Sequence, residues 1–294
     1  MRVTKNILGR VIAASLITGI ALAGSQFAAS AGELPAGADR IGVLRNGHLS
    51  VKEGSLFAAW TSQLGDLRKF EIAGDLIGAL TTDGSLLVKE GKLTAEWALQ
   101  ATGVQDFRLS SNRIAVLRAD GSLAVTEGLH GPFVEQATGV TDFEVTNNRI
   151  GIVTTAGTAL VKQGGLTASW VEQTAGAKDL ELTSTRVGVV RTDNSIAVRD
   201  GLAGTWIEQA SGVDKLALAG DRIGVVRTDG SVAVKDGLFG AWSEQAGEAS
   251  AVELAGDRIG VLRTDGTVAV KVGQGSFVDQ TAGAQQIGLA APGA

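Results

Sequence analysis

Several residue types are missing or rare in this 294-residue chain, and each absence removes a class of function. The lack of any cysteine excludes disulfides, thiolate nucleophiles and cysteine-based zinc sites. Only two histidines occur, His48 and His130, so an acid–base site built on histidine is not expected. The Gly-x-Ser-x-Gly motif of serine hydrolases and the acidic loop of EF-hands are also absent. We therefore expect a protein without catalytic activity, bound metal or cofactor.

Long apolar runs are scarce, and the single one lies near the start of the chain. It covers residues 11–24, follows three basic residues and precedes the small-residue tripeptide Ala29-Ser30-Ala31. That order is typical of a secretory signal peptide cleaved after Ala31. A membrane anchor is the alternative, but the run is short for a helix that spans a bilayer. We expect residues 1–31 to be removed and the remaining protein to be secreted and soluble.

The chain also has fewer basic than acidic residues. Removing residues 1–31 takes away three of the 26 Lys and Arg residues and leaves 23 against 31 Asp and Glu residues, a net charge of −8. A chain with this balance is repelled by nucleic acids and anionic lipids. We expect neither a nucleic-acid partner nor membrane insertion.

Glycine, in contrast, is abundant, with 41 residues, and much of it belongs to an internal repeat. A polar residue, an arginine, a β-branched residue and a small residue return seven times at spacings of 36 or 37 residues, and only the second copy replaces the arginine, by Leu76. The β-branched residues of the copies are Ile41, Ile77, Ile114, Ile150, Val187, Ile223 and Ile259. Glycines that recur without a following helix indicate turns and close packing rather than phosphate binding.

Each repeat contains four short apolar segments, and the second and third are joined in most copies by Asp-Gly, a strong hairpin signal. Four strands repeated seven times predict an all-β fold, a seven-bladed β-propeller with four-stranded blades. A trefoil would need three larger repeats, and a solenoid would need capped ends. The chain enters its first repeat at the second segment and ends after a seventh first segment, so the N- and C-terminal strands should pair and close the ring. One domain is expected over 32–294, with repeats starting near 39, 75, 112, 148, 185, 221 and 257.

Two positions recur with unusual regularity. Aromatic residues occupy one position in every repeat, where they either pack between neighbouring blades or stack on sugar rings. They are Trp60, Trp97, Phe133, Trp170, Trp206, Trp242 and Phe277. A glutamine follows three residues later, where its amide either satisfies the backbone or binds sugar hydroxyls. These candidate glycan-binding residues are Gln63, Gln100, Gln136, Gln173, Gln209, Gln245 and Gln280.

Positions that vary between repeats are a second source of candidates. Three residues before most of the aromatics, a predicted loop carries Phe57, His130 and Phe239 in three of the copies, and we take these as candidate glycan contacts. Basic residues end the third segments, and a solvated charged rim is the expectation for them. Many acids recur in register, as Glu135 and Glu172 do, which argues against the symmetry-breaking carboxylates of a glycosidase.

The segment from Asp229 to Gln245, "DGSVAVKDGLFGAWSEQ", together with "KLALAGDRIGV" at residues 215–225, resembles the repeats of tectonin- and tachylectin-type propeller lectins. The likeness extends over nearly all of residues 38–290. The glycine-rich, tyrosine-free composition is similar to that of secreted actinobacterial propeller lectins. Some of those are lectin subunits of umbrella-type antibacterial toxin particles, joined through an adaptor to a toxin chain. The resemblance implies a secreted lectin that binds surface glycans as the targeting subunit of such an assembly. The alternative is a protein-binding propeller whose channel or face holds an extended segment of a partner.

Overall fold

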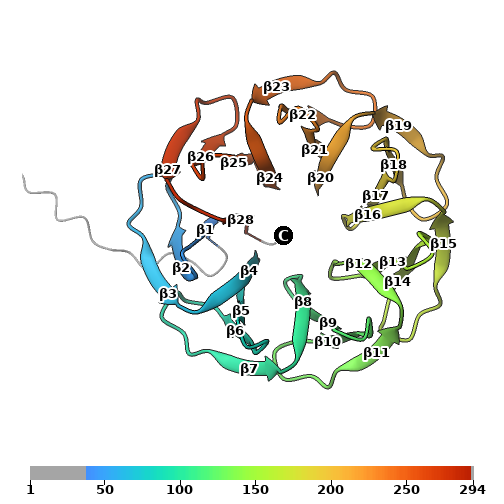
Figure 1. Ribbon diagram of the computed structural model, residues 1–294, viewed down its shortest axis with the longest axis horizontal. Coiled ribbons are helices and arrows are strands. Elements are labelled where there is room, and N and C mark those ends of the chain that lie inside the picture. Colours follow the sequence, from blue (N-terminus) through green and yellow to red (C-terminus); the bar gives the residue numbers. More distant parts are fainter. Residues whose placement is uncertain (1–37, 293–294) are drawn as a thin grey trace, which may run out of the picture. The chain divides into compact units, whose positions relative to one another are not determined.

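The computed structural model describes residues 38–292, and all the regular structure in that range consists of 28 β-strands. The strands form seven four-stranded antiparallel sheets arranged as blades around a central axis (Figure 1). The predicted all-β, seven-bladed propeller is therefore confirmed. The predicted signal peptide and its cleavage site lie outside the described residues. Within residues 38–292 no helix is long and apolar enough to cross a membrane.

Each blade has an innermost, a second, a third and an outermost strand. The innermost strands of blades 1 to 7 are β28 (Gln286–Ala290), β4 (Leu67–Ala73), β8 (Val104–Leu109), β12 (Val140–Val145), β16 (Ala177–Leu182), β20 (Val213–Ala219) and β24 (Ala249–Ala255). The second strands are β1 (Arg40–Arg45), β5 (Leu76–Thr81), β9 (Arg113–Arg118), β13 (Arg149–Thr154), β17 (Arg186–Arg191), β21 (Arg222–Arg227) and β25 (Arg258–Arg263).

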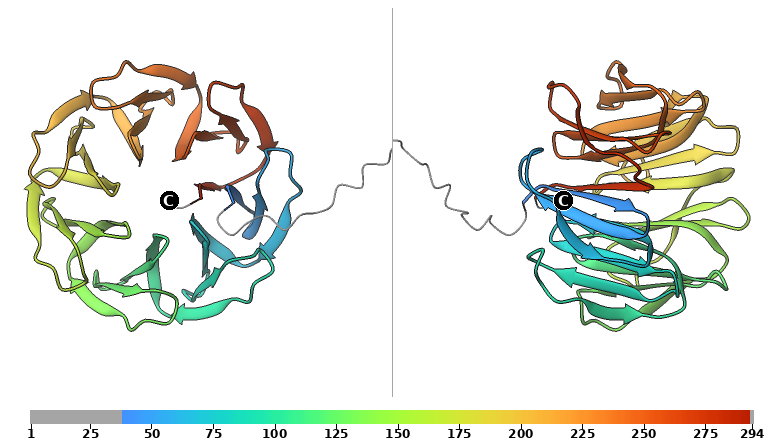
Figure 2. Two further views of the ribbon diagram at one scale, coloured as in Figure 1. Left: turned by 180° about the vertical axis from the view of Figure 1, so that it is seen from behind. Right: turned by 60° about the vertical axis from the view of Figure 1, so that its left-hand side comes forward.

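The third strands, in the same order, are β2 (His48–Glu53), β6 (Leu86–Glu90), β10 (Leu123–Glu127), β14 (Ala159–Gln163), β18 (Ile196–Asp200), β22 (Val232–Asp236) and β26 (Val268–Val272). The outermost strands are β3 (Thr61–Leu64), β7 (Ala98–Ala101), β11 (Val134–Ala137), β15 (Val171–Thr174), β19 (Ile207–Ala210), β23 (Ser243–Ala246) and β27 (Val278–Thr281). Because consecutive strands run in opposite directions, their connections alternate between two faces of the ring (Figure 2). We call the face with the loops between third and outermost strands face A, and the opposite one, with the Asp-Gly turns, face B.

The Asp-Gly turns form as the sequence predicts. In blade 2, Gly84 has φ of +84° and its N–H donates to the carbonyl of Thr81 at 3.1 Å. The Asp83 carboxylate accepts the N–H of Ser85 at 3.0 Å. Glycine tolerates this left-handed backbone, and the aspartate supplies an acceptor for a turn N–H, so each hairpin is encoded locally.

The last strand closes the ring. β28 pairs antiparallel with β1, with Leu289 opposite Ile41 and Ile287 opposite Val43. The predicted pairing of the N- and C-terminal strands is therefore confirmed. Blade 1 is assembled from both ends of the described chain, which leaves no open sheet edge between blade 7 and blade 1.

The apolar core is divided among the seven boundaries between blades. The cluster at the boundary of blades 2 and 3 joins Leu80 and Val88 of one blade to Phe107 and Val116 of the next. The recurring aromatics pack against these clusters, as Trp97 does at the boundary of blades 1 and 2. The prediction that they pack between blades is confirmed.

The basic residues of the third strands do not form the solvated rim that the sequence suggested. Lys52, Lys89 and Lys162 are buried, with 2–4% of their surface exposed, and their ammonium groups lie 4.7–4.8 Å from the ring centroids of tryptophans. Each lysine also donates to a loop carbonyl, as Lys89 does to that of Leu93. The charged rim was the wrong interpretation, because the aromatic ring and the carbonyls together offer these cations a buried site.

Candidate functional site: the central channel

The innermost strands alternate between residues that pack into the blades and residues that face the axis. In β4, Phe70 is buried between blades, whereas Lys69 and Glu71 on either side face the channel. One ring of equivalent positions contains Lys69, Asp106, Asp142, Asp179, Lys215, Ala251 and Gln286. The next ring contains Glu71, Arg108, Glu144, Glu181, Ala217, Glu253 and Gly288. Charged side chains from different blades therefore converge on the axis.

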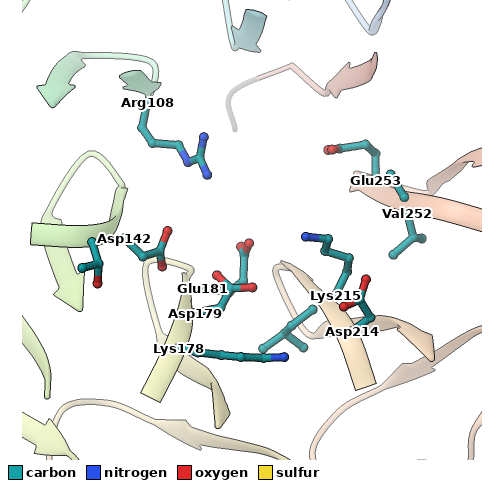
Figure 3. Close-up of a pocket in the computed structure, with 12 residues that line it drawn as sticks. Arg108, Asp142, Lys178, Asp179, Glu181, Asp214, Lys215, Val252 and Glu253 are labelled. Carbon is teal, nitrogen blue, oxygen red and sulfur yellow. The ribbon is translucent and has the colours of Figure 1, made fainter. Parts of the chain in front are cut away.

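Two cavities of about 450 Å³ and 360 Å³ lie along this axis. They share the lining residues Arg108, Glu181 and Glu253, so they are parts of one channel. Figure 3 shows that Arg108, Asp142, Glu181, Lys215 and Glu253, from five consecutive blades, extend into the same opening. Each cavity falls within the range of about 300–1,000 Å³ that ligand sites occupy.

The charges around the channel are unevenly distributed. Seven carboxyl groups and four basic groups line the two cavities, which leaves an excess of three carboxyl groups. Most of the compensation lies at blades 2 to 4. There Arg108 contacts Glu71 at 2.8 Å and Glu144 at 3.1 Å, and Lys69 contacts Glu71 at 2.9 Å and Asp106 at 2.6 Å. Lys69 and Arg108 lower the pKa of Asp106 although burial opposes them.

At four carboxyl groups of blades 4, 5 and 7, burial outweighs the attraction of the nearby cations. Burial, together with the neighbouring charge of Asp179, raises the pKa of Asp142 to about 7. Burial also raises the pKa of Glu253 to about 7, with a further contribution from Glu71. Burial and the neighbouring charge of Glu144 also raise the pKa of Glu181. Burial raises the pKa of Glu144 itself to about 8. This part of the channel therefore exchanges protons near neutral pH.

The arrangement is suited to binding positively charged groups. The channel contains no histidine, and no group of three or more acidic or histidine side chains within residues 38–292 is placed to hold a metal ion. A cation that enters it meets carboxylates that are partly shielded from water, which strengthens their attraction.

The three loop candidates lie outside this channel. Phe57 and Phe239 are 82% and 84% exposed, and His130 is also exposed. They occupy equivalent loops of blades 1, 6 and 3 on face A, so the structure places them on one face but on separate blades. A role in glycan binding stays a prediction for them.

The seven candidate glutamines share one structural environment. Each amide Nε2 donates to the backbone carbonyl two residues earlier in the outermost strand, at 2.8–3.3 Å. The amide oxygens of Gln63, Gln136 and Gln173 accept from the basic residues Lys89, Lys162 and Arg199 of the next blade. These bonds connect blades, and the proposed contact with sugar hydroxyls stays a prediction.

Sequence reasoning named the channel as a possible binding place but missed the charged residues that line it. The signal was present, because five of the seven alternating first segments carry a charged residue between their two apolar ones, as Glu71 lies between Phe70 and Ile72. The apolar residues of these segments indicate packing. The acids that argued against a glycosidase, such as Glu135, lie on outermost strands. There Glu135 pairs with Arg118 at 2.8 Å.

Comparisons with known proteins agree with the fold. No protein-family model matches the sequence, and no curated protein matches it either. The surface component PorZ of the type-IX secretion system of Porphyromonas gingivalis matches with a TM-score of 0.63 at 10% identity, over 83% of this chain and 37% of that chain. Prp20p of Saccharomyces cerevisiae matches with a TM-score of 0.61 at 9% identity, over 85% and 86% of the two chains. The computationally designed protein Ika8 matches with a TM-score of 0.57 at 17% identity, over 83% and 81%.

These likenesses concern the fold alone, because every identity is low. The chain spans 37% of the length of PorZ. The resemblance to tectonin-type lectins stays a prediction from the sequence.

Proposed function

We propose that this propeller is a non-catalytic binding module that holds an extended, positively charged segment of a partner protein in its central channel. The observation that carries the proposal is the excess of carboxyl groups around two connected cavities, with Glu181 and Glu253 lining both. The structure of Prp20p was described with its binding to Gsp1p and histones, which supports a propeller of this type as a protein-binding scaffold.

Electrostatics favours a cationic segment over a neutral one. Bringing a lysine or arginine side chain among uncompensated carboxylates relieves their mutual repulsion and lowers their pKa values. Binding therefore releases protons and should weaken as the pH falls from 8 to 6, because Asp142 and Glu253 are then protonated.

A labelled peptide of alternating Lys and Gly tests the proposal by fluorescence anisotropy. The double variant Glu181→Gln/Glu253→Gln should bind it at least tenfold more weakly than the parent at pH 8. The matched control is Glu172→Gln, which removes an exposed acid from the outermost strand β15 and should leave binding unchanged. Equal loss in both variants, or equal binding of a Glu-Gly peptide, would reject the channel as the binding site.

A second candidate function is carbohydrate binding, which the exposed Phe57 and Phe239 favour. Aromatic faces stack on sugar rings, and several weak sites on one rigid ring would gain strength by avidity. In this proposal the protein is a secreted lectin that targets a larger antibacterial toxin assembly to surface glycans through an adaptor. A glycan array with the mature protein tests it, and intact mass of the exported form tests cleavage after Ala31.

A further inference from the structure

Six of the seven boundaries between blades share a pair of cations near face A. The first is the arginine that opens the second strand, and the second is the basic residue of the third strand in the following blade. At the boundary of blades 1 and 2, these are Arg40 and Lys89. Burial lowers the pKa of Lys89 to about 8, and the nearby positive charge of Arg40 contributes to the decrease. Arg113 and Lys162, and Arg186 and Lys235, form the same pair at two further boundaries.

Similar acceptors surround Arg40 and Arg113, whereas Arg149 meets Gln163 in place of a carboxylate and Arg258 pairs with Asp39. Arg40 pairs with Glu53 at the end of the third strand of its own blade at 2.7 Å and donates to the carbonyls of Gly74 and Gly91 in the next blade. Arg113 contacts Glu127 at 2.9 Å and the carbonyl of Gly164 at 2.6 Å. At these two boundaries the receptor is a carboxylate of one blade together with loop and turn carbonyls of the next.

The boundary of blades 2 and 3 has the receptor but neither cation. Leu76 replaces the arginine, and Thr126 replaces the lysine. The equivalent acceptors are the exposed carboxylate of Glu90 and the carbonyls of Ser111 and Gly128. Within residues 38–292, no arginine donates to these two carbonyls in the way that Arg40 and Arg113 donate to those of Gly91 and Gly164.

A buried polar group at this boundary is also left without a partner. The hydroxyl of Thr126 is 0% exposed and makes no hydrogen bond, although its backbone lies where other blades carry a lysine. Buried polar groups in proteins are almost always satisfied, so this hydroxyl calls for a partner such as a water molecule or a group of a ligand.

Blades 2 and 3 are held together elsewhere and do not need these cations for cohesion. Lys69 of blade 2 pairs with Asp106 at 2.6 Å, and Arg108 of blade 3 pairs with Glu71 at 2.8 Å on the channel side. Arg68 also donates to the carbonyl of Val104 at 2.6 Å. The unfilled receptor on face A is therefore separate from the contacts that secure this boundary.

We propose that the boundary between blades 2 and 3 is a binding site for the guanidinium group of an arginine side chain supplied by a partner protein. The guanidinium pairs with Glu90 and donates to the carbonyls of Ser111 and Gly128, as Arg40 and Arg113 do with the equivalent groups at their own boundaries. Because Thr126 carries no charge, the incoming cation meets none of the repulsion that each arginine–lysine pair endures. The site shares with the proposed function only the premise of a protein partner and lies on face A, outside the channel.

Ethylguanidinium, which reproduces the end of an arginine side chain, is the probe, and amide NMR shifts of the ¹⁵N-labelled protein are the readout. The amides of Gly128 and Ser111 should shift saturably in the parent. Leu76→Arg fills the receptor from within the chain, so it should weaken the response at least tenfold. The double variant Arg186→Leu/Lys235→Thr creates a second gap of this kind between blades 5 and 6, and it should add a response at Gly237 while the response at Gly128 remains.

The NMR shifts distinguish binding of ethylguanidinium on face A from its binding in the channel. Ethylguanidinium that enters the channel shifts the amide of Leu180, which donates to Asp142 at 2.9 Å, and Glu181→Gln/Glu253→Gln should change that response alone. Equal shifts of Gly128 in the parent and in Leu76→Arg would overturn the site on face A. So would an equal response to tetramethylammonium, because that cation cannot donate hydrogen bonds and would reveal plain charge attraction.

Discussion

The glycines of the second strands lie where the next blade packs most closely against the sheet. A Cβ added to Gly78 would lie 2.5 Å from the ring of Phe107, and one added to Gly42 would lie 2.5 Å from the ring of Phe70. Both rings are fully buried, so they cannot move aside cheaply. The recurrence of glycine here reflects contact between blades rather than an unusual backbone angle.

Replacing Gly78 by alanine should therefore destabilise the protein. The added methyl group forces Phe107 out of its packed position, which costs about 1–3 kcal/mol by comparison with other overpacked cores. Chemical denaturation measures the change. Gly165→Ala is the control, since a Cβ there meets no atom within 4 Å, and it should have almost no effect. Equal stability of the two variants would contradict close packing at Gly78.

The exposed phenylalanines give a second test at the scale of single residues. Changing both Phe57 and Phe239 to alanine should weaken glycan binding if carbohydrate recognition is a function of the protein. Their exposure of 82% and 84% means that stability should change by no more than about 0.5 kcal/mol each. Glycan-array signals and a thermal melt decide the matter together. Unchanged glycan binding would remove both residues from the candidate site.

At the scale of elements, β28 is the strand on which the ring depends. It is the innermost strand of blade 1, and its side chains also contact the next blade, where Gln286 donates to the carbonyl of Phe70 at 2.7 Å. Ile287 and Leu289 are 2% and 7% exposed within the cluster between blades 7 and 1. One short strand therefore joins three blades.

Deleting residues 285–294 should unfold or aggregate the protein. Each buried side chain of β28 contributes roughly 1.5–3 kcal/mol, so their sum is comparable to a typical domain stability of about 5–15 kcal/mol. Size-exclusion chromatography and thermal melting provide the measurement. Removal of 292–294 alone should be tolerated, because Pro292 is exposed. A monomeric longer deletion as stable as the parent would show that closure by β28 is dispensable.

At the scale of the whole molecule, the converging carboxyl groups link stability to pH. Burial raises the pKa of Asp142 and Glu253 to about 7 and that of Glu144 to about 8, above the usual carboxyl range of about 4. Between these limits the folded protein binds more protons than the unfolded chain. The stability that these protonated carboxyl groups contribute is therefore full at the acidic end of this pH range and is lost as the pH rises toward 8.

We expect the melting temperature to rise when the pH falls from 8 to 5.5. The increase should be at least about 2–4 °C, which 1 kcal/mol produces in a domain of this size. Glu253→Gln fixes one group in its uncharged form and should flatten the dependence, whereas Glu172→Gln should not. Differential scanning calorimetry across the pH series supplies the measurement. A melting temperature that falls over the same range would show that the channel carboxyls are not the dominant linkage.

The sequence by itself determined the number of blades, the order of their strands and the closure of the ring. Hairpins are local: Asp83 and Gly84 form their turn from neighbouring residues. Ring closure follows from the incomplete first and last repeats, because each supplies the strands that the other lacks. Such features need only the sequence pattern and its period.

Only the tertiary structure decided which side chains meet across blades. Glu71, Arg108 and Glu144 lie 36 or 37 residues apart in the chain and form one ion-paired group because the innermost strands converge on the axis. The buried lysines were mistaken for a rim for the same reason, since the aromatic ring and the carbonyls that hold Lys89 become visible only when strands and loops are assembled. A strand's alternation shows that it has two sides, but the curvature of the whole ring decides which side faces the channel and which faces the next blade.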